Sequence, residues 1–91
     1  MVRSFRDDDT RKLAGRIPVK RLRSVERAAR KTLRWLEVAT SLRDLSLPGL
    51  RLEKLKGDRA GQYSIRVNDQ YRVCFTWKDD GAHGVELTDY H

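Results

Sequence analysis

The chain changes its hydrophobic period at Pro48-Gly49, and this change constrains the fold more than any other feature. Before this dipeptide, apolar residues recur every three or four positions, as they do along one face of a helix. After it, they alternate with polar residues, as they do in half-buried strands. Helices followed by strands joined through short turns predict an α+β fold with a mainly antiparallel sheet. We expect a single domain spanning residues 1–91, because a chain this short does not support two separate cores.

Two helices are predicted before the change of period, at residues 7–15 and at about 19–39. Asp7 to Thr10 supply N-cap candidates and first-turn carboxylates for the first helix, and Gly15 is a C-terminal stop. The second helix carries one apolar stripe that we expect in the core. The stripe consists of Leu22, Val25, Ala29, Leu33, Leu36 and Ala39.

Strands are predicted at residues 51–56, 62–67, 71–77 and 84–88, with a short half-buried strand at residues 2–6. The register of the central hairpin follows from burial, because both of its strands need their apolar sets on the same face. A three-residue loop at 68–70 meets this requirement, whereas a two-residue turn does not. The same register places Arg66 directly opposite Arg72 on the other face.

Two arginines facing each other across a ladder repel, so the fold must compensate for them. One interpretation is neutralisation by a carboxylate on a neighbouring strand, such as Glu53 or Glu86. The other is an anion site on an open, polar sheet face. The second interpretation predicts that Arg72→Ala leaves stability level or raises it, because a repulsion is relieved.

The positive charge is concentrated in one part of the chain. The net charge is +7 and fourteen of the 20 basic residues are Arg, which suits bidentate contacts to phosphate. Residues 6–34 account for the whole excess. Six basic residues lie opposite the apolar stripe of the second helix. They form either a nucleic-acid contact or a solvated surface. As a partner for this charge, a polyanion fits better than a membrane surface. They are Lys20, Arg23, Arg27, Arg30, Lys31 and Arg34.

Several classes of function are disfavoured. No apolar run exceeds three residues, so we expect no membrane span and no signal peptide, and the single Cys74 fits a cytoplasmic protein. Phosphate-binding and dinucleotide-binding motifs are absent, and His83 and His91 alone do not make a zinc site. We therefore expect no metal ion and no cofactor.

Three strings in the second half of the chain occur together. They are Leu55-Lys56-Gly57-Asp58-Arg59-Ala60-Gly61-Gln62-Tyr63-Ser64-Ile65-Arg66, Tyr71-Arg72-Val73-Cys74-Phe75, and the terminal Asp89-Tyr90-His91. In this combination the sequence resembles the HigB-like toxins of the RelE superfamily, which are the toxins of type II toxin–antitoxin modules. The resemblance covers nearly the whole chain.

The resemblance implies a fold, an activity and partners. The expected fold has two N-terminal helices packed on one face of a twisted sheet. The expected activity is metal-independent cleavage of mRNA in the ribosomal A site. The expected partners are the ribosome with its small-subunit rRNA, mRNA, and a helix-turn-helix (HigA-like) antitoxin, with operator DNA bound only through the antitoxin.

The resemblance also implies catalytic roles for residues of the three strings. Lys56, Arg72 and Arg66 are expected to stabilise charge on the phosphate, and His91 is suited to proton transfer near neutral pH. Tyr90 is expected to stack on a base and Asp89 to orient the imidazole or a 2′-OH. Glu53 stands where some family members have a catalytic histidine, so the alternative is an inert antitoxin-binding or nucleic-acid-binding module, or a co-repressor.

Overall fold

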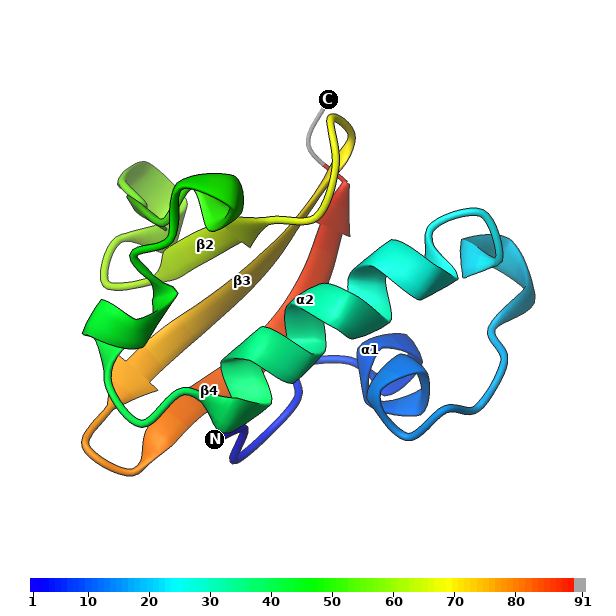
Figure 1. Ribbon diagram of the computed structural model, residues 1–91, viewed down its shortest axis with the longest axis horizontal. Coiled ribbons are helices and arrows are strands. Elements are labelled where there is room, and N and C mark those ends of the chain that lie inside the picture. The colour runs from blue at the N-terminus through cyan, green and yellow to red at the C-terminus, as the bar shows by residue number, and fades with distance from the viewer. Residues whose placement is uncertain (90–91) are drawn as a thin grey trace.

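The computed structural model describes residues 1–89 as an α+β fold, which confirms the predicted fold class (Figure 1). The helices are α1 (Asp8–Ala14) and α2 (Glu26–Val38). The strands are β1 (Glu53–Lys54), β2 (Tyr63–Arg66), β3 (Tyr71–Lys78) and β4 (Gly81–Asp89). They form one antiparallel sheet in the order β1-β2-β3-β4. Four short 3₁₀ helices lie in the connections: η1 (Lys20–Leu22), η2 (Leu42–Leu45), η3 (Pro48–Leu50) and η4 (Gly57–Arg59).

The core lies between α2 and one face of the sheet, where α2 crosses in front of the strands (Figure 1). The apolar stripe predicted for the second helix is buried, and Ile65, Val73 and Phe75 meet it from the sheet. Tyr63 stacks on Phe75, with ring centroids 6.2 Å apart. The alternation that predicted the strands therefore also identified the face that packs against α2.

The second helix begins later than its apolar spacing predicted. Residues 20–26 form turns with hydrogen bonds between residues three apart, such as Leu22 N to Val19 O at 2.9 Å and Val25 N to Leu22 O at 3.1 Å. The α-helical bond from Ala29 N to Val25 O follows at 2.8 Å. Leu22 and Val25 are three residues apart, a spacing that a 3₁₀ turn buries as well as an α-helix does, so the pattern did not distinguish the two.

The first helix has the predicted caps and lies between α2 and the edge of the sheet. Asp7 is the N-cap and accepts from Thr10 N at 3.3 Å, and Gly15 is the C-cap. The buried Thr10 hydroxyl accepts a hydrogen bond from Leu87 N of β4 at 2.9 Å. Helix α1 therefore closes part of the β4 edge.

The central hairpin has the predicted register. Tyr63 pairs with Phe75, Ile65 with Val73, and Arg66 with Arg72, and the loop is residues 68–70. Strand β1 is shorter than predicted, since Arg51 adopts a left-handed conformation (φ 43°) just before it and η4 follows soon after. Strand β4 is longer and starts at Gly81.

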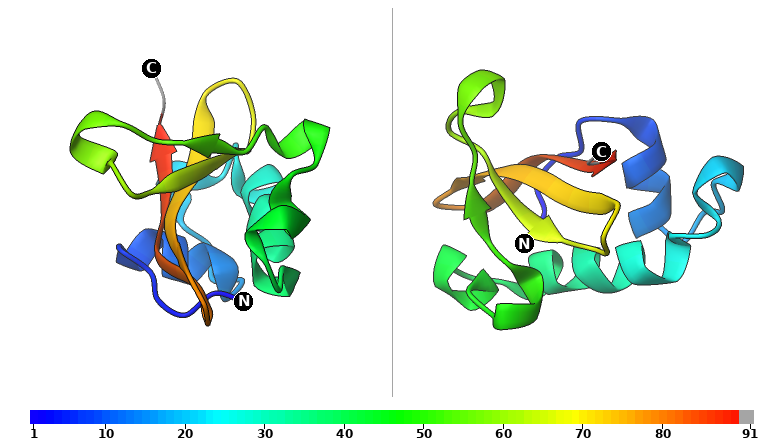
Figure 2. Two further views of the ribbon diagram at one scale, coloured as in Figure 1. Left: turned by 90° about the vertical axis from the view of Figure 1, so that its left-hand side faces the viewer. Right: turned by 90° about the horizontal axis from the view of Figure 1, so that it is seen from above.

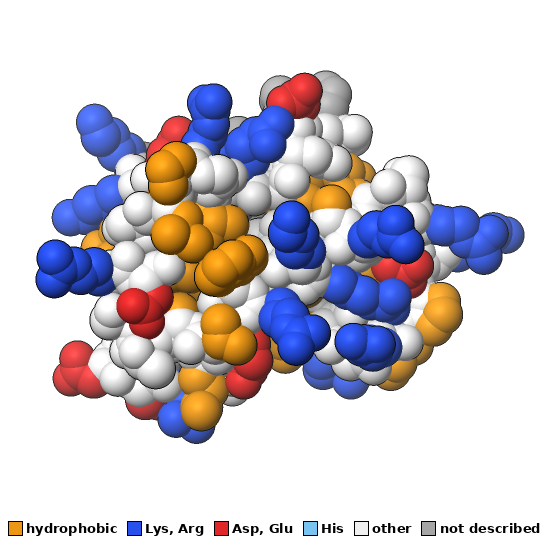
Figure 3. Space-filling view, in the orientation of Figure 1, with side chains coloured by type: hydrophobic (Ala, Val, Ile, Leu, Met, Phe, Trp, Pro, Cys, Tyr) orange, Lys and Arg blue, Asp and Glu red, His pale blue; other side chains and the backbone are white. Residues whose placement is uncertain are grey.

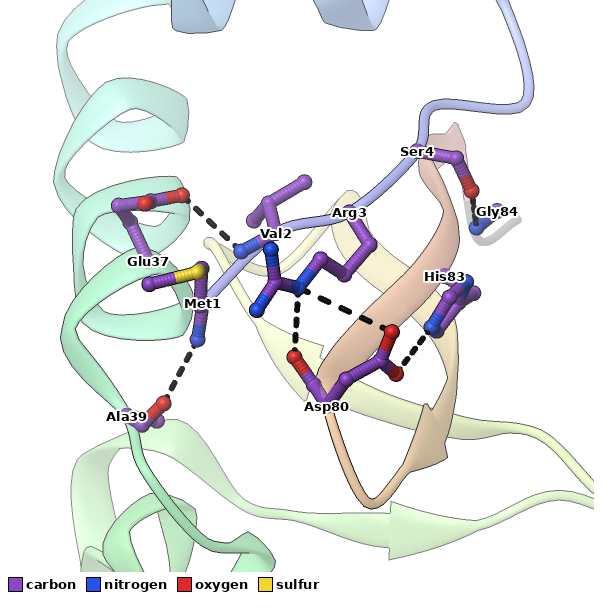
Figure 4. A network of polar contacts seen from close by, with 9 residues as sticks. All are labelled: Met1, Val2, Arg3, Ser4, Glu37, Ala39, Asp80, His83 and Gly84. Atoms are coloured by element: carbon purple, nitrogen blue, oxygen red, sulfur yellow. Dashed lines mark hydrogen bonds and ion pairs between the residues drawn. The ribbon is translucent and has the colours of Figure 1, made fainter.

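The N-terminal segment runs parallel to β4 through two isolated bridges, Val2 with Ala82 and Phe5 with Val85, so the predicted strand at 2–6 is reduced to these bridges. Figure 4 shows this segment joined to the end of α2, where Val2 N donates to Glu37 Oε2 at 3.0 Å. A Cβ added at Gly81 would lie 2.2 Å from the Met1 carbonyl oxygen. Only glycine therefore allows this close approach.

Candidate active site and nucleic-acid interface

The sheet face opposite α2 carries most of the predicted catalytic residues that the structure describes. Ser64, Cys74 and Glu86 lie in one row across the strands, and Arg66, Arg72 and Thr88 lie in the next. Figure 2 shows η4 on this side of the sheet, away from α2. Arg59 of η4 reaches Glu86 with an Nη2–Oε1 distance of 3.0 Å.

This face is covered. The interpretation of the arginine pair as an anion site required an open face. Ser64 and Cys74 are fully buried, and Arg72 has a relative exposure of 9%. The expectation of an open face was wrong, because strand alternation identifies which residues share a face but not what covers that face. Here the connection that contains η4 contributes Arg59 above the sheet.

Arg72 is held by groups on two sides of its guanidinium. Its Nε donates to Ser64 Oγ at 2.7 Å, and its Nη2 donates to the Arg51 carbonyl at 2.6 Å and to the Ser64 carbonyl at 3.3 Å. The Glu53 carboxylate lies 4.0 Å from the same Nη2. The structure thus brings Arg72 and Glu53 together, as the interpretation of a carboxylate on a neighbouring strand predicted.

Arg66 has a different environment although it stands directly opposite Arg72. Its Nη2 contacts the exposed Asp69 carboxylate in the hairpin loop, and its side chain is 34% exposed. The two like charges therefore have different carboxylate neighbours. This arrangement reduces the repulsion that the register implies.

The other predicted catalytic residues are more dispersed. Lys56 is exposed and precedes η4. Asp89 ends β4, and its Oδ2 accepts from Gln70 Nε2 at 3.1 Å. Strand alternation directs Asp89 and Arg72 to opposite faces, because Thr88 is the residue that pairs with Arg72. Tyr90 and His91 lie outside the described residues.

Sequence reasoning did not single out Ser64, Arg51 or Arg59. A signal for Ser64 existed, because the predicted register places it opposite Cys74 and diagonal to Arg72, within reach of a long side chain. The roles of Arg51 and Arg59 depend on the path of the connection between η3 and β2. No periodic pattern encodes that path.

The predicted basic surface is formed by α2 and the turn before it. Lysine and arginine side chains gather over this part of the molecule in Figure 3. Five of the six predicted residues are exposed, and we refer to them as the α2 basic surface. They are Lys20, Arg23, Arg27, Lys31 and Arg34.

Arg30 belongs to the scaffold and not to the α2 basic surface. It is partly buried, its Nε donates to the Leu13 carbonyl at 3.0 Å, and its Nη2 lies 3.0 Å from Glu26 Oε1. Arg30 therefore links α2 to the end of α1. The helical spacing placed it on the basic face, but α1 packs against that position.

Two hollows flank Lys31 and Arg34. The larger has a volume of about 540 Å³ and lies among Phe5, Leu33 and Arg16. The smaller, of about 290 Å³, is also lined by Trp35 and Val38. Both hollows thus combine apolar lining with cationic side chains, and Glu37 adds a carboxylate to the larger one.

Three aspartates have lowered pKa values, and none of them lies beside Arg72. A side-chain hydrogen bond from Arg11, supported by Lys12, lowers the pKa of Asp8. Hydrogen bonds from Thr40 and Ser41 lower the pKa of Asp44, and the contact with His83 lowers that of Asp80. These carboxylates serve the fold through helix ends and turns.

Neither a metal-binding cluster nor a membrane-spanning helix was found in the part of the chain that the structure describes. Residues 1–89 contain no group of three or more His, Cys, Asp or Glu side chains placed to hold a metal ion. In the same range no helix has the length and the apolar character needed to cross a bilayer.

The fold matches that of a chain in a solved two-protein complex. The chain aligns with a chain of the YoeB–YefM complex from Staphylococcus aureus with a TM-score of 0.64 and 19% identity, covering 100% of this chain and 98% of the other. This likeness concerns the architecture, in which helices pack on one face of a small antiparallel sheet. It places the chain in the class of small proteins with the RelE-like toxin fold.

The sequence defines the family more narrowly. Residues 1–91 match the model of the family described as "RelE-like toxin of type II toxin-antitoxin system HigB", and the chain belongs to this family. It is 44% identical over 68 residues to Toxin HigB-1 of Vibrio cholerae serotype O1, an alignment that covers 74% of this chain and 67% of the relative. It is 34% identical over 59 residues to Endoribonuclease HigB of Proteus vulgaris, covering 65% of this chain and 64% of the relative.

Proposed function

We propose that this chain is an endoribonuclease that cleaves mRNA in the ribosomal A site and thereby inhibits translation in the cytoplasm. Its membership of the HigB-like toxins and the name of the Proteus vulgaris relative support an RNA-cleaving activity. The observation that carries the proposal is the guanidinium of Arg72, fixed on one sheet face beside the Glu53 carboxylate. A guanidinium held in this way can stabilise the negative charge of a phosphorane, and the neighbouring carboxylate can accept a proton.

The reaction that suits these residues is attack of the RNA 2′-OH on the adjacent phosphorus. The 2′-oxygen loses its proton and bonds to phosphorus, and the 5′-oxygen leaves with a proton, which yields a 2′,3′-cyclic phosphate and a 5′-OH. The protein supplies acid, base and charge stabilisation, so the step needs no metal ion.

The roles proposed for the individual residues follow the family resemblance. Arg72 and Lys56 stabilise the charge of the phosphorane, and Arg66 adds to the positive potential. His91 accepts the proton of the 2′-OH or donates a proton to the leaving 5′-oxygen, and Glu53 is the alternative base. Tyr90 stacks on a base of the RNA, and Asp89, which ends β4, orients the imidazole of His91 or a 2′-OH.

The partners fit the distribution of charge. The α2 basic surface contacts rRNA of the small subunit, because exposed Arg and Lys side chains suit a phosphate backbone. A HigA-like helix-turn-helix antitoxin silences the toxin and alone contacts operator DNA. The structural match to a chain of a YoeB–YefM complex supports an antitoxin partner.

The chemistry is tested with an mRNA that carries a single 2′-deoxy nucleotide at the cleaved position, bound to purified ribosomes. The proposal predicts that the all-RNA substrate gives a 2′,3′-cyclic phosphate and that the 2′-deoxy substrate is not cut. Products with a 3′-OH and a 5′-phosphate would instead indicate attack by water, and the proposed roles would be wrong.

A second candidate function is an inert module that binds the antitoxin or nucleic acid. The position of Glu53 favours it, because its carboxylate lies 4.0 Å from Arg72 Nη2 and offsets the positive charge that a phosphate needs. This candidate predicts normal ribosome binding without any cleavage, whereas the endoribonuclease predicts both.

A further inference from the structure

Ser64 is a fully buried polar residue in the middle of the sheet. It lies on β2 between Glu53 of β1 and Cys74 of β3, on the face that carries Arg72. A buried hydroxyl needs a hydrogen-bond partner, and here the partner is Arg72 Nε at 2.7 Å. Ser64 therefore makes a specific hydrogen bond with Arg72 at a buried position where a small apolar side chain would make none.

The contacts of Ser64 and Arg51 fix the orientation of the guanidinium. This group is planar and presents its N–H donors in a rigid fork. One edge donates through Nε to the Ser64 hydroxyl, and Nη2 donates to the carbonyls of Arg51 and Ser64. Two separate anchor points on a planar group prevent it from rotating about the end of its side chain.

The backbone of Arg51 is bent where it meets Arg72. Arg51 has φ 43° and ψ 56°, a left-handed conformation that is unfavourable for any residue other than glycine. Its carbonyl oxygen is the acceptor at 2.6 Å from Arg72 Nη2. The unfavourable conformation is thus part of the arrangement that holds the guanidinium.

We propose that Ser64, together with the Arg51 carbonyl, is a positioning residue that orients Arg72 for phosphate stabilisation. The inference rests on the role of Arg72 in RNA cleavage proposed above. Because Ser64 is fully buried, RNA cannot reach its hydroxyl, and Ser64 acts through Arg72. Substitution of Ser64 should therefore change the rate of the chemical step and leave affinity for the ribosome unchanged.

The test is a double-mutant cycle on Ser64 and Arg72, read out as single-turnover cleavage of A-site mRNA on purified ribosomes. At saturating toxin, Ser64→Ala is expected to lower the cleavage rate by about 10- to 100-fold, the scale of a misplaced catalytic group, while ribosome affinity is unchanged. In the Arg72→Ala background, Ser64→Ala is expected to cause no further loss. Ser64→Thr keeps the hydroxyl and is expected to recover most of the rate.

Cys74→Ala is the matched control, because Cys74 is equally buried, pairs with Ser64 across the ladder and lies on the same face. It is expected to reduce thermal stability without slowing cleavage. A wild-type rate for Ser64→Ala, or an equal loss in both Arg72 backgrounds, would overturn the positioning role. If the single variant Arg72→Ala cleaves at the wild-type rate, the proposed role of Arg72 in the reaction is wrong instead.

A measurement on the unaltered protein complements the cycle. In a ¹H–¹⁵N NMR spectrum, the Arg72 Nε–H is expected to give a signal that exchanges slowly with water, since it donates to a buried hydroxyl. The Arg66 side chain, which contacts the exposed loop carboxylate of Asp69, is expected to exchange fast. Equal exchange at the two sites would contradict the proposed fixation of Arg72.

Discussion

Arg66 and Arg72 show how one residue type takes two roles on the same ladder. They are directly paired, yet Arg72 is buried among Ser64, Arg51 and Glu53, while Arg66 contacts the loop residue Asp69. The difference arises from the groups that each guanidinium reaches, which are Ser64, Glu53 and the Arg51 carbonyl for Arg72, and Asp69 of the hairpin loop for Arg66. Consequently, the two arginines should respond differently to the same substitution.

We predict that Arg72→Ala destabilises the fold by about 2–3 kcal/mol, because it leaves the buried hydroxyl of Ser64 and the Arg51 carbonyl without their donor. Arg66→Ala, the matched substitution across the ladder, is expected to change stability by less than about 0.5 kcal/mol, as exposed pairs contribute little. Urea denaturation of the two variants checks this. Equal stability changes would show that the repulsion between the arginines dominates their local contacts.

The register of these residues could be predicted from the sequence, but their burial could not. Alternation of apolar residues in two strands and the length of the loop determine which side chains are opposite each other. Arg72 donates to the carbonyl of Arg51, which lies in a connection without periodicity. The sequence therefore predicted the pair and its two interpretations, but not that Arg72 is buried.

At the scale of elements, α2 combines an apolar face in the core with the α2 basic surface in solvent. The spacing of three and four residues predicted both faces, because it follows from the helical repeat alone. It failed for Arg30, which α1 covers, and for residues 20–25, which form tighter turns. Both failures depend on how neighbouring elements pack, which the helical repeat does not encode.

We predict that replacing Arg27, Lys31 and Arg34 together with Glu weakens ribosome binding and flattens its dependence on salt, because fewer counterions are released from RNA. The fold is expected to persist, since all three side chains are exposed. The measurement is ribosome affinity by sedimentation at several salt concentrations.

The matched control for this variant carries the same change of charge at exposed positions outside α2. It replaces Arg6, Arg43 and Lys78 with Glu. A salt slope that changes equally in both variants would mean that net charge alone governs binding. Arg30→Glu is expected to behave differently from either, with reduced thermal stability, because it breaks the link to Leu13 and repels Glu26.

At the scale of the whole molecule, α2, which carries the α2 basic surface, packs on one face of the sheet, and η4 lies on the other side (Figure 2). The strand register places Arg72 on the face away from α2. This separation fits a protein that contacts a large RNA scaffold with one side and a substrate strand with the other. It also explains why two classes of substitution, one affecting affinity and one affecting rate, are expected.

Acid is expected to destabilise the fold through its exposed carboxylates. The pKa values of Asp8, Asp44 and Asp80 are lowered from 3.8, so each carboxylate holds its proton less tightly in the folded state than in the unfolded chain. The resulting stabilisation is complete above the unfolded value and is lost as the pH falls through the folded one. We predict level urea midpoints down to about pH 5 and a decrease below about pH 4.

Asp44→Asn is expected to reduce this acid-dependent decrease, because it removes one carboxylate whose hydrogen bonds from Thr40 and Ser41 hold the pKa low. The variant and the parent chain are compared by their urea midpoints across this range. An unchanged pH dependence in Asp44→Asn would assign the acid sensitivity to other groups.

The most direct test of the proposed function is cleavage of a defined mRNA by the purified protein, with and without ribosomes. The mRNA is placed with a known codon in the A site, and its 5′ ends are mapped after single-turnover reaction. We predict a cut within the A-site codon that requires the ribosome and that His91→Gln abolishes, because glutamine does not exchange protons near neutral pH. An intact mRNA on ribosomes to which the protein is bound, or equal cutting of the free mRNA, would contradict this function.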